Sequence, residues 1–170
     1  TEWLATDGKY AYTYDAAGNT TAKGNRIKIN GLQYRVDTQT ARNYLEIAAA
    51  EHREIEFVES GEEVEYWEYE WNVLNQLEQV KKNEIYLSRY TYDIDGLRSI
   101  KYNYITGETT HYVYESENLI FEKNVASGEV RYYVYDGMGK QLTRVEGVLD
   151  NGEFVERKRY FLITDHLGSV

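Results

Sequence analysis

The stretch Tyr133-Val134-Tyr135-Asp136-Gly137-Met138-Gly139 decides the fold, because versions of it recur along the chain. In each copy a Tyr-Xaa-aromatic pair is followed by an acid or amide and, three residues later, by Gly or Asn. Four copies fill the second half of the chain, and their first tyrosines are 21, 22 and 21 residues apart. A fixed period of this length predicts a stack of small supersecondary units, each burying a face against its neighbours.

The copies share the same residue types at the same spacing. The motif residues are Tyr12, Tyr14, Asp15 and Gly18; Tyr69, Trp71, Asn72 and Asn75; Tyr90, Tyr92, Asp93 and Gly96; Tyr112, Tyr114, Glu115 and Asn118; and Tyr133, Tyr135, Asp136 and Gly139. A degraded copy, Tyr34-Arg35-Val36-Asp37, lies 22 residues after Tyr12. We interpret all these residues as structural.

Turn signals recur at half the period, with Tyr-, Val-, Ile- and Thr-rich stretches between them that are typical of strands. Each repeat is therefore two strands and two turns, and the sequence predicts an all-β, antiparallel meander of hairpins. In the motif turns, Asp accepts backbone N–H groups and Gly adopts a positive φ. A second, tighter kind of turn is expected at Thr106-Gly107, Ser127-Gly128 and Asn151-Gly152.

The two aromatic rings of each motif point to the same sheet face, because side chains alternate with period two. Eighteen tyrosines against four phenylalanines fit a face that is partly wet. Cross-strand aromatic neighbours stabilise a sheet by about 0.2–1 kcal/mol per pair. We interpret the tyrosines as structural cement, with a ligand-binding aromatic platform as the alternative.

Composition limits the classes of function. The chain of 170 residues has a net charge of −10, which argues against binding to a phosphate backbone and discourages edge-to-edge association of sheets. There is no cysteine, and no apolar run approaches the roughly 20 residues that span a bilayer. We therefore expect no nucleic-acid partner, no membrane span and no cofactor. Because the sequence begins at Thr1, we expect it to be cut from a longer protein.

The N-terminal part is less regular. Apolar residues at 41, 44, 45 and 48, with Thr40 placed to cap, predict a short helix near 41–54, although Tyr44-Leu45-Glu46-Ile47 would also suit a strand. We expect one β-sheet unit over 1–170, with first repeats over 1–36, an irregular insertion over 37–65 and regular repeats over 66–158. A junction segment follows over 159–170.

An acidic run flanks a probable turn at Ser60-Gly61 and consists of Glu54, Glu56, Glu59, Glu62, Glu63, Glu65, Glu68 and Glu70. If the flanking strands pair, carboxylates face carboxylates, which is destabilising unless cations intervene. Calcium favours such oxygen-rich sites, but the regular loop spacing of a calcium motif is absent. We interpret the run as a solvated sheet face.

No catalytic or metal-binding constellation stands out. Asp165, His166 and Ser169 invite a triad interpretation, but adjacent Asp and His do not converge as a triad requires. His52 and His111 are isolated, and each is most simply a surface or half-buried strand residue. We expect the chain not to be an enzyme and to hold no metal.

The pattern Tyr-Xaa-Tyr-Asp-Xaa-Xaa-Gly, followed by a basic residue and Leu, resembles the signature of YD repeats, and Asp136 to Leu142 match it closely. The C-terminal Asp165-His166-Leu167-Gly168 resembles the start of the Rhs-associated core. The chain is thus similar to bacterial Rhs/YD-repeat proteins, a family related to toxin-complex C components, wall-associated toxins and teneurins. The resemblance implies a secreted or cell-surface shell that encloses a C-terminal toxin. The segment carrying the family's cleavage aspartates is missing.

Size narrows this expectation. About twelve strands at roughly 4.8 Å give a sheet about 58 Å wide, and closed on itself it would be only about 18 Å across. Such a cylinder is filled by its own side chains, so the chain is expected to be a section of wall, partnered by the rest of a longer chain and by the enclosed toxin segment. Open sheet edges predict some self-association.

The alternative function is a cell-surface carbohydrate- or choline-binding module, since hairpins of about 20 residues also build such solenoids. Those modules need open aromatic cages, usually with tryptophan, and this chain has only Trp3, Trp67 and Trp71. A turn-forming acid or amide follows each tyrosine pair, which favours cement over cages.

Overall fold

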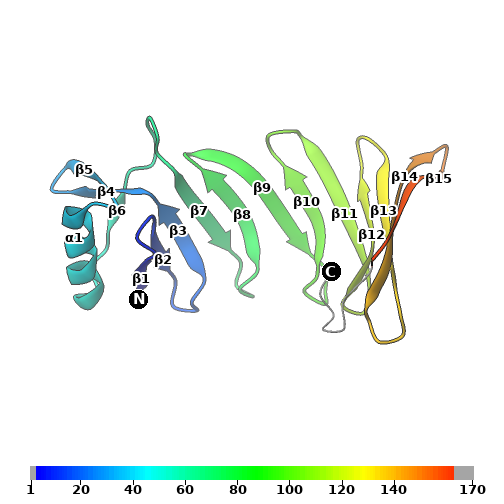
Figure 1. Cartoon of the computed structure of the whole chain (residues 1–170), viewed down its shortest axis with the longest axis horizontal. Helices are drawn as coiled ribbons and strands as arrows, with labels where there is room; N and C mark the ends of the chain where they lie inside the picture. The colour runs from blue at the N-terminus through cyan, green and yellow to red at the C-terminus, as the bar shows by residue number, and fades with distance from the viewer. Residues whose placement is uncertain (1–2, 163–170) are drawn as a thin grey trace. The chain divides into compact units, whose positions relative to one another are not determined.

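The computed structural model describes residues 3–162, and apart from one helix its regular elements are strands (Figure 1). A twelve-stranded sheet is formed by β1 (Trp3–Thr6), β2 (Ala11–Tyr14), β3 (Thr20–Gly24), β7 (Tyr66–Trp71), β8 (Leu77–Lys82), β9 (Ile85–Tyr92), β10 (Arg98–Asn103), β11 (Glu108–Glu115), β12 (Asn118–Asn124), β13 (Glu129–Tyr135), β14 (Gln141–Asp150) and β15 (Glu153–Phe161). Its strands follow one another in chain order, with antiparallel pairing, except that β7 follows β3. The predicted all-β meander is confirmed.

The chain divides into two compact units, Thr1–Arg89 and Tyr90–Val170. In the first unit the meander is interrupted by a three-stranded sheet of β4 (Arg26–Ile29), β5 (Leu32–Arg35) and β6 (Glu56–Phe57), in the order β5-β4-β6. The degraded motif copy lies at the end of β5, in this small sheet.

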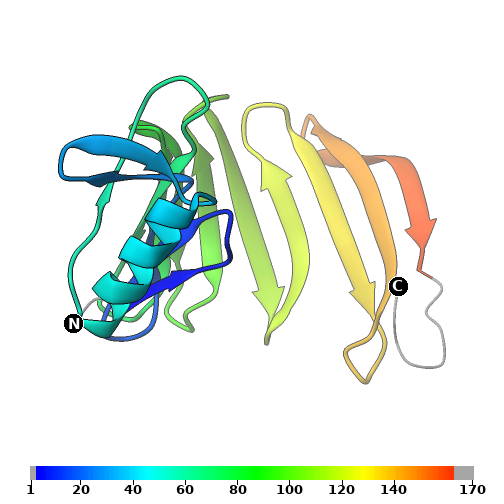
Figure 2. The same cartoon turned by 60° about the vertical axis from the view of Figure 1, so that its left-hand side comes forward.

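Helix α1 (Gln39–Ala50) contacts β1, β4 and β5 (Figure 2). Its side chains at Ala41, Leu45 and Ala48 are buried, as the spacing predicted. The cap is Thr38, not Thr40, and the Thr38 side chain accepts the N–H of Ala41. The strand alternative for this segment is wrong, because its apolar residues recur with helical period and pack on the small sheet.

The core of the first unit lies between the helix, the small sheet and the large sheet. It consists of Ala11, Ala22, Ile27, Val36, Ala41, Leu45, Phe57, Val58, Val64 and Tyr66. Gly24 is required at the junction, because a Cβ there would lie 2.4 Å from the ring of Phe57. Asn25 then fixes the return of the chain: its backbone N–H donates to the Glu65 carbonyl, and its Oδ1 accepts the Glu65 N–H.

The second unit is a simple succession of hairpins with a thinner core. Val130 and Val145 are buried, and the ring of Tyr132 contacts Phe121 and Phe154, with centroids 5.0 and 4.9 Å away. This aromatic row crosses several strands, because Phe121 of β12 is directly opposite Tyr132 of β13.

Candidate functional site

The motif turns form the most regular feature of the molecule. In four copies the turn closes with the same hydrogen bonds around the acid or amide. At Asp93, the side-chain Oδ1 accepts the N–H groups of Asp95 (3.0 Å) and Leu97 (2.8 Å). The backbone N–H of Asp93 donates to the Leu97 carbonyl, and the Gly96 N–H donates to the Asp93 carbonyl. The same four bonds occur around Asp15, Asn72 and Asp136.

The fourth residue of each of these turns has the positive φ that the sequence predicted. The values are 88° at Gly18, 59° at Asn75, 80° at Gly96 and 80° at Gly139. Neighbouring turns also touch in the first unit, where the Asn19 amide donates to Asn75 Oδ1 at 3.1 Å. These side chains hold the backbone of the turn.

The copy at Glu115 folds differently. Glu115 is directly opposite Asn118, and the turn between them consists of Ser116 and Glu117, with φ 54° at Ser116. This turn is one residue shorter than the others, and Asn118 begins strand β12 instead of occupying the positive-φ position.

Two of the three turns that we expected to be tight are wider. Asn103 is opposite Glu108, so the loop there has four residues, and Asn103 Oδ1 accepts the N–H groups of Ile105 and Thr106. The loop from Asn124 to Gly128 has the same arrangement. Only Asn151-Gly152 is a two-residue turn with two positive φ angles, as predicted. An Asn four residues before each Gly107-type glycine was the available signal.

The motif tyrosines are partly buried. Burial raises the pKa of Tyr69, Tyr112, Tyr114 and Tyr135 above the ordinary value. The pKa of Tyr133 rises to about 12, first through burial and then through the nearby Glu122 carboxylate. The hydroxyl of Tyr135 donates to the Leu119 carbonyl at 2.8 Å. These rings pack and cross-link neighbouring strands.

Several aromatic faces are covered by the chain's own cations. The Lys82 ammonium lies 4.7 Å from the centroid of Trp67, and the Arg98 guanidinium lies 4.0 Å from that of Tyr90. Lys23 covers Tyr10 at 4.1 Å in the same way. Trp71 is fixed by a hydrogen bond from its Nε1 to the Thr20 carbonyl.

A ladder of alternating charge crosses the second unit. The register places Glu122, Arg131, Glu146 and Lys158 opposite one another on β12 to β15. Arg131 Nη1 lies 2.6 Å from Glu122 Oε1, and Arg131 Nε lies 3.5 Å from Glu146 Oε1. Arg144 Nε also approaches Glu146 Oε1 at 3.2 Å. The carboxylates of this face are therefore paired with guanidinium groups.

The acidic run does not form the facing carboxylates that pairing of its two flanks would give. β6 pairs with β4 while β7 pairs with β3, so the flanks belong to different sheets. Glu56 pairs with Lys28 at 2.5 Å, Glu70 pairs with Lys81 at 3.1 Å, and Glu65 accepts the hydroxyl of Tyr10. Within residues 3–162, no cluster of three or more His, Asp or Glu side chains is arranged to hold a metal ion.

The remaining candidates are scattered. His52 is not a strand residue; it follows helix α1 with φ 52°, while His111 lies exposed on β11. The junction residues Asp165, His166, Leu167 and Gly168, and Ser169, lie outside the described residues. Across the described part, no helix has the length and apolar character needed to cross a membrane.

Comparisons with known proteins give a loose likeness. No protein-family model matches the chain, and no curated protein matches it. The chain is similar to parts of chains in the crystal structures of TcdB2-TccC3 (12% identity, TM-score 0.36) and TcdB2-TccC3-Cdc42 (11% identity, TM-score 0.35). The match covers 89% of this chain and 9% of the solved chain in both cases. At these values the likeness carries no argument about function.

Proposed function

We propose that this chain is a non-catalytic structural segment of a YD-repeat shell, from a secreted or cell-surface bacterial Rhs-type protein that encapsulates or delivers a C-terminal toxin. The observation that carries the proposal is the identical turn built around Asp15, Asn72, Asp93 and Asp136. In each turn the motif side chain is occupied by backbone N–H groups, so the repeated residues build a wall.

The tyrosines support the same role. The Tyr135 hydroxyl is bonded to a backbone carbonyl of β12, and the Tyr133 hydroxyl donates to Glu122 at 3.1 Å. A buried phenol with a raised pKa stays protonated at neutral pH and serves as a hydrogen-bond donor. These groups are therefore suited to joining strands.

The alternative of a choline- or glycan-binding module is disfavoured by the resident cations. An aromatic cage binds a quaternary ammonium through the open face of its rings. Here Lys82 and Arg98 already occupy the faces of Trp67 and Tyr90. A ligand would have to displace side chains that are tethered to the same sheet.

The delivery part of the proposal rests on the YD-repeat resemblance alone. Twelve strands at roughly 4.8 Å are too few to surround a folded cargo. The enclosing wall would then include further strands of a longer polypeptide, with β1 and β15 as the ends of this section. We further propose that these ends allow weak self-association of the isolated chain, and strictly monomeric light scattering at high concentration would count against it.

The test is protease protection in the native product. The protein is purified from its host, its intact mass and termini are determined, and it is treated with protease before and after denaturation. We expect a product much longer than 170 residues, with an internal polypeptide that resists digestion until the shell unfolds. A native product of this length alone would refute encapsulation, and glycan-array binding would then support the alternative.

A matched pair of variants in the native protein separates wall formation from other effects. Asp93→Ala removes the acceptor of two backbone N–H groups, whereas Glu115→Ala removes an exposed carboxylate from a turn that lacks these bonds. We expect weaker protease protection in the first variant and unchanged protection in the second.

A further inference from the structure

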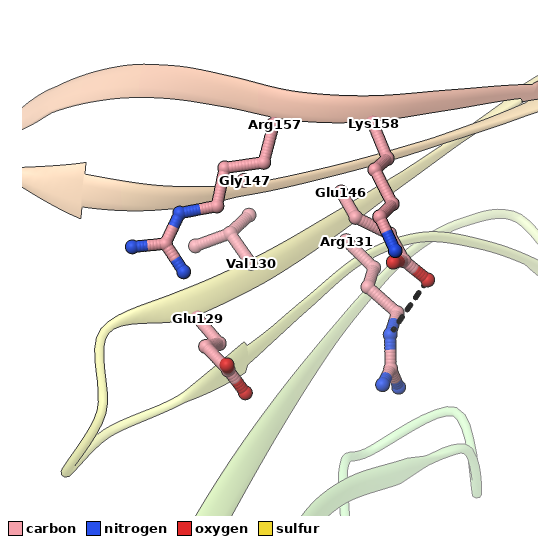
Figure 3. A pocket seen from close by; sticks show the side chains of 7 residues that line it. All are labelled: Glu129, Val130, Arg131, Glu146, Gly147, Arg157 and Lys158. Carbon is pink, nitrogen blue, oxygen red and sulfur yellow. Dashed lines mark ion pairs between the residues drawn. The ribbon is translucent and has the colours of Figure 1, made fainter.

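A β-bulge in the last hairpin places two cations side by side. Glu146 is opposite Lys158 while Gly147 is opposite Glu156, so Arg157 is an additional residue with no partner across the pair. Successive side chains of a regular strand point to opposite faces, but a bulge re-aims a side chain. Figure 3 shows Arg157 and Lys158 extending from β15 into the same pocket.

The bulge depends on a glycine. A Cβ at Gly147 would lie 2.3 Å from the carbonyl oxygen of Val155 and 2.5 Å from the ring of Phe154. Any other residue at this position would push β15 away from β14. The close approach of the two strands therefore fixes where Arg157 and Lys158 leave the backbone.

The pocket has a volume of about 220 Å³ and is lined by Glu129, Val130, Arg131, Glu146, Gly147, Arg157 and Lys158. It belongs entirely to the second unit. At about 30 Å³ per water molecule, it has room for about seven waters. It is smaller than the range of about 300–1,000 Å³ typical of sites for drug-sized ligands. Its occupant is therefore a small molecule or a single charged group.

The charges of the pocket are unequally satisfied. The Arg131 guanidinium pairs with Glu122 and Glu146, and Glu146 is further paired with Arg144. For Arg157 and Lys158, residues 3–162 supply no hydrogen bond or ion pair to either head group. The carboxylate of Glu129 is the remaining charged group. Two cations and one carboxylate thus remain for a ligand.

We propose that this pocket binds a small oxyanion, a carboxylate or a phosphate, held between the Arg157 guanidinium and the Lys158 ammonium. An arginine fork matches the two oxygens of a carboxylate or phosphate, and a lysine adds a second positive charge. Because Glu129 repels a bare anion, it favours a ligand that also presents an N–H or O–H donor to it.

The chain's net charge of −10 makes such a site conspicuous. An overall negative field repels anions at long range, so binding must come from groups in direct contact. The affinity will fall as salt is added, since both cations are solvent-exposed.

The test is an NMR titration of the ¹⁵N-labelled chain at low ionic strength with inorganic phosphate, succinate and glutamate in parallel. We expect saturable shifts of the amides of Gly147 and Arg157. Saturation by phosphate alone identifies a tetrahedral oxyanion, saturation by succinate or glutamate identifies a carboxylate, and either supports the proposal. Tighter binding of glutamate than of succinate would show Glu129 meeting the ligand ammonium. Absence of saturable shifts with all three probes would refute the proposal.

Matched charge variants decide whether the site is specific. Arg157→Gln should weaken binding at least about tenfold, because a charge-assisted hydrogen bond is lost. Arg159→Gln removes the same charge from the same strand, but Arg159 pairs with Glu156 and does not line the pocket. It should change affinity less than about threefold. Glu129→Gln should tighten phosphate binding. Equal losses in both arginine variants would overturn the site in favour of nonspecific attraction.

Discussion

The two-residue turn between β8 and β9 carries a removable strain. Lys82 is opposite Ile85, and both residues between them have positive φ: 48° at Asn83 and 67° at Glu84. The equivalent turn at 151–152 has glycine in its second position, with φ 87°. Glu84 is exposed and contributes no side-chain contact that would offset the strain.

We predict that Glu84→Gly stabilises the chain by about 0.5–1 kcal/mol. A left-handed conformation costs a non-glycine residue about 1–2 kcal/mol, and glycine avoids that cost. Glycine also gives the unfolded chain more freedom, which offsets about 0.4–1 kcal/mol of the gain. For a chain of this size the expected rise in Tm is about 1–4 °C.

Asn83→Gly is the matched control in the same turn. Asn83 Oδ1 accepts the Tyr66 N–H at 2.8 Å, and its amide donates to the Val64 carbonyl at 2.7 Å. Losing these bonds should destabilise the chain by about 1–2 kcal/mol, more than the small relief of strain at an asparagine. Urea unfolding with an unchanged m-value measures both variants. A Glu84→Gly protein less stable than the parent would refute the strain argument.

Three further changes test other parts of the fold. Asn72→Ala should cost about 1–2 kcal/mol in urea unfolding because the turn loses its side-chain acceptor, whereas Glu115→Ala should stay within about 0.5 kcal/mol of the parent. Hydrogen bonds from backbone N–H groups and a tyrosine hydroxyl lower the pKa of Asp7 to about 2, so its contribution to stability is full above pH 3.8 and is lost as the pH falls toward 2. Asp7→Asn should therefore flatten the stability profile between pH 4 and 2, and an unchanged slope would contradict this. Gly24→Ala should cost about 1–3 kcal/mol, partly restored by Phe57→Leu, since the new Cβ meets that ring.

Local chemistry made much of the fold predictable. The turn at Asp93 follows from the acceptor on the first residue and the freedom of Gly96, and both lie within a few positions of each other. Helix α1 follows from the burial period of Ala41, Leu45 and Ala48. Its cap was misplaced by two residues, because both Thr38 and Thr40 suit the position chemically and only packing of the helix chooses between them.

Pairing over long distances was not predictable. β3 pairs with β7 across more than 40 residues, and the small sheet forms between them. The contact between Gly24 and Phe57 that allows this is invisible to hydrophobic period. The acidic run was misjudged for the same reason, since its two flanks belong to different sheets.

The pocket at the bulge was missed because alternation assigns Arg157 and Lys158 to opposite faces. One additional residue in β15 cancels that rule locally. The only sequence signal was Gly147 in the middle of an otherwise regular strand, a position where glycine often marks a bulge.

The motif turns have a consequence for how this chain can vary. All of their closing bonds come from the first side chain and the backbone, so the residues at the tip are released from structural duty. Val73, Ile94 and Met138 are 99%, 101% and 90% exposed at these tips. Substitutions there can accumulate, and labels or short epitopes can be grafted there, without disturbing the sheet beneath. One end of every such hairpin is thus open to diversification while its support stays constant.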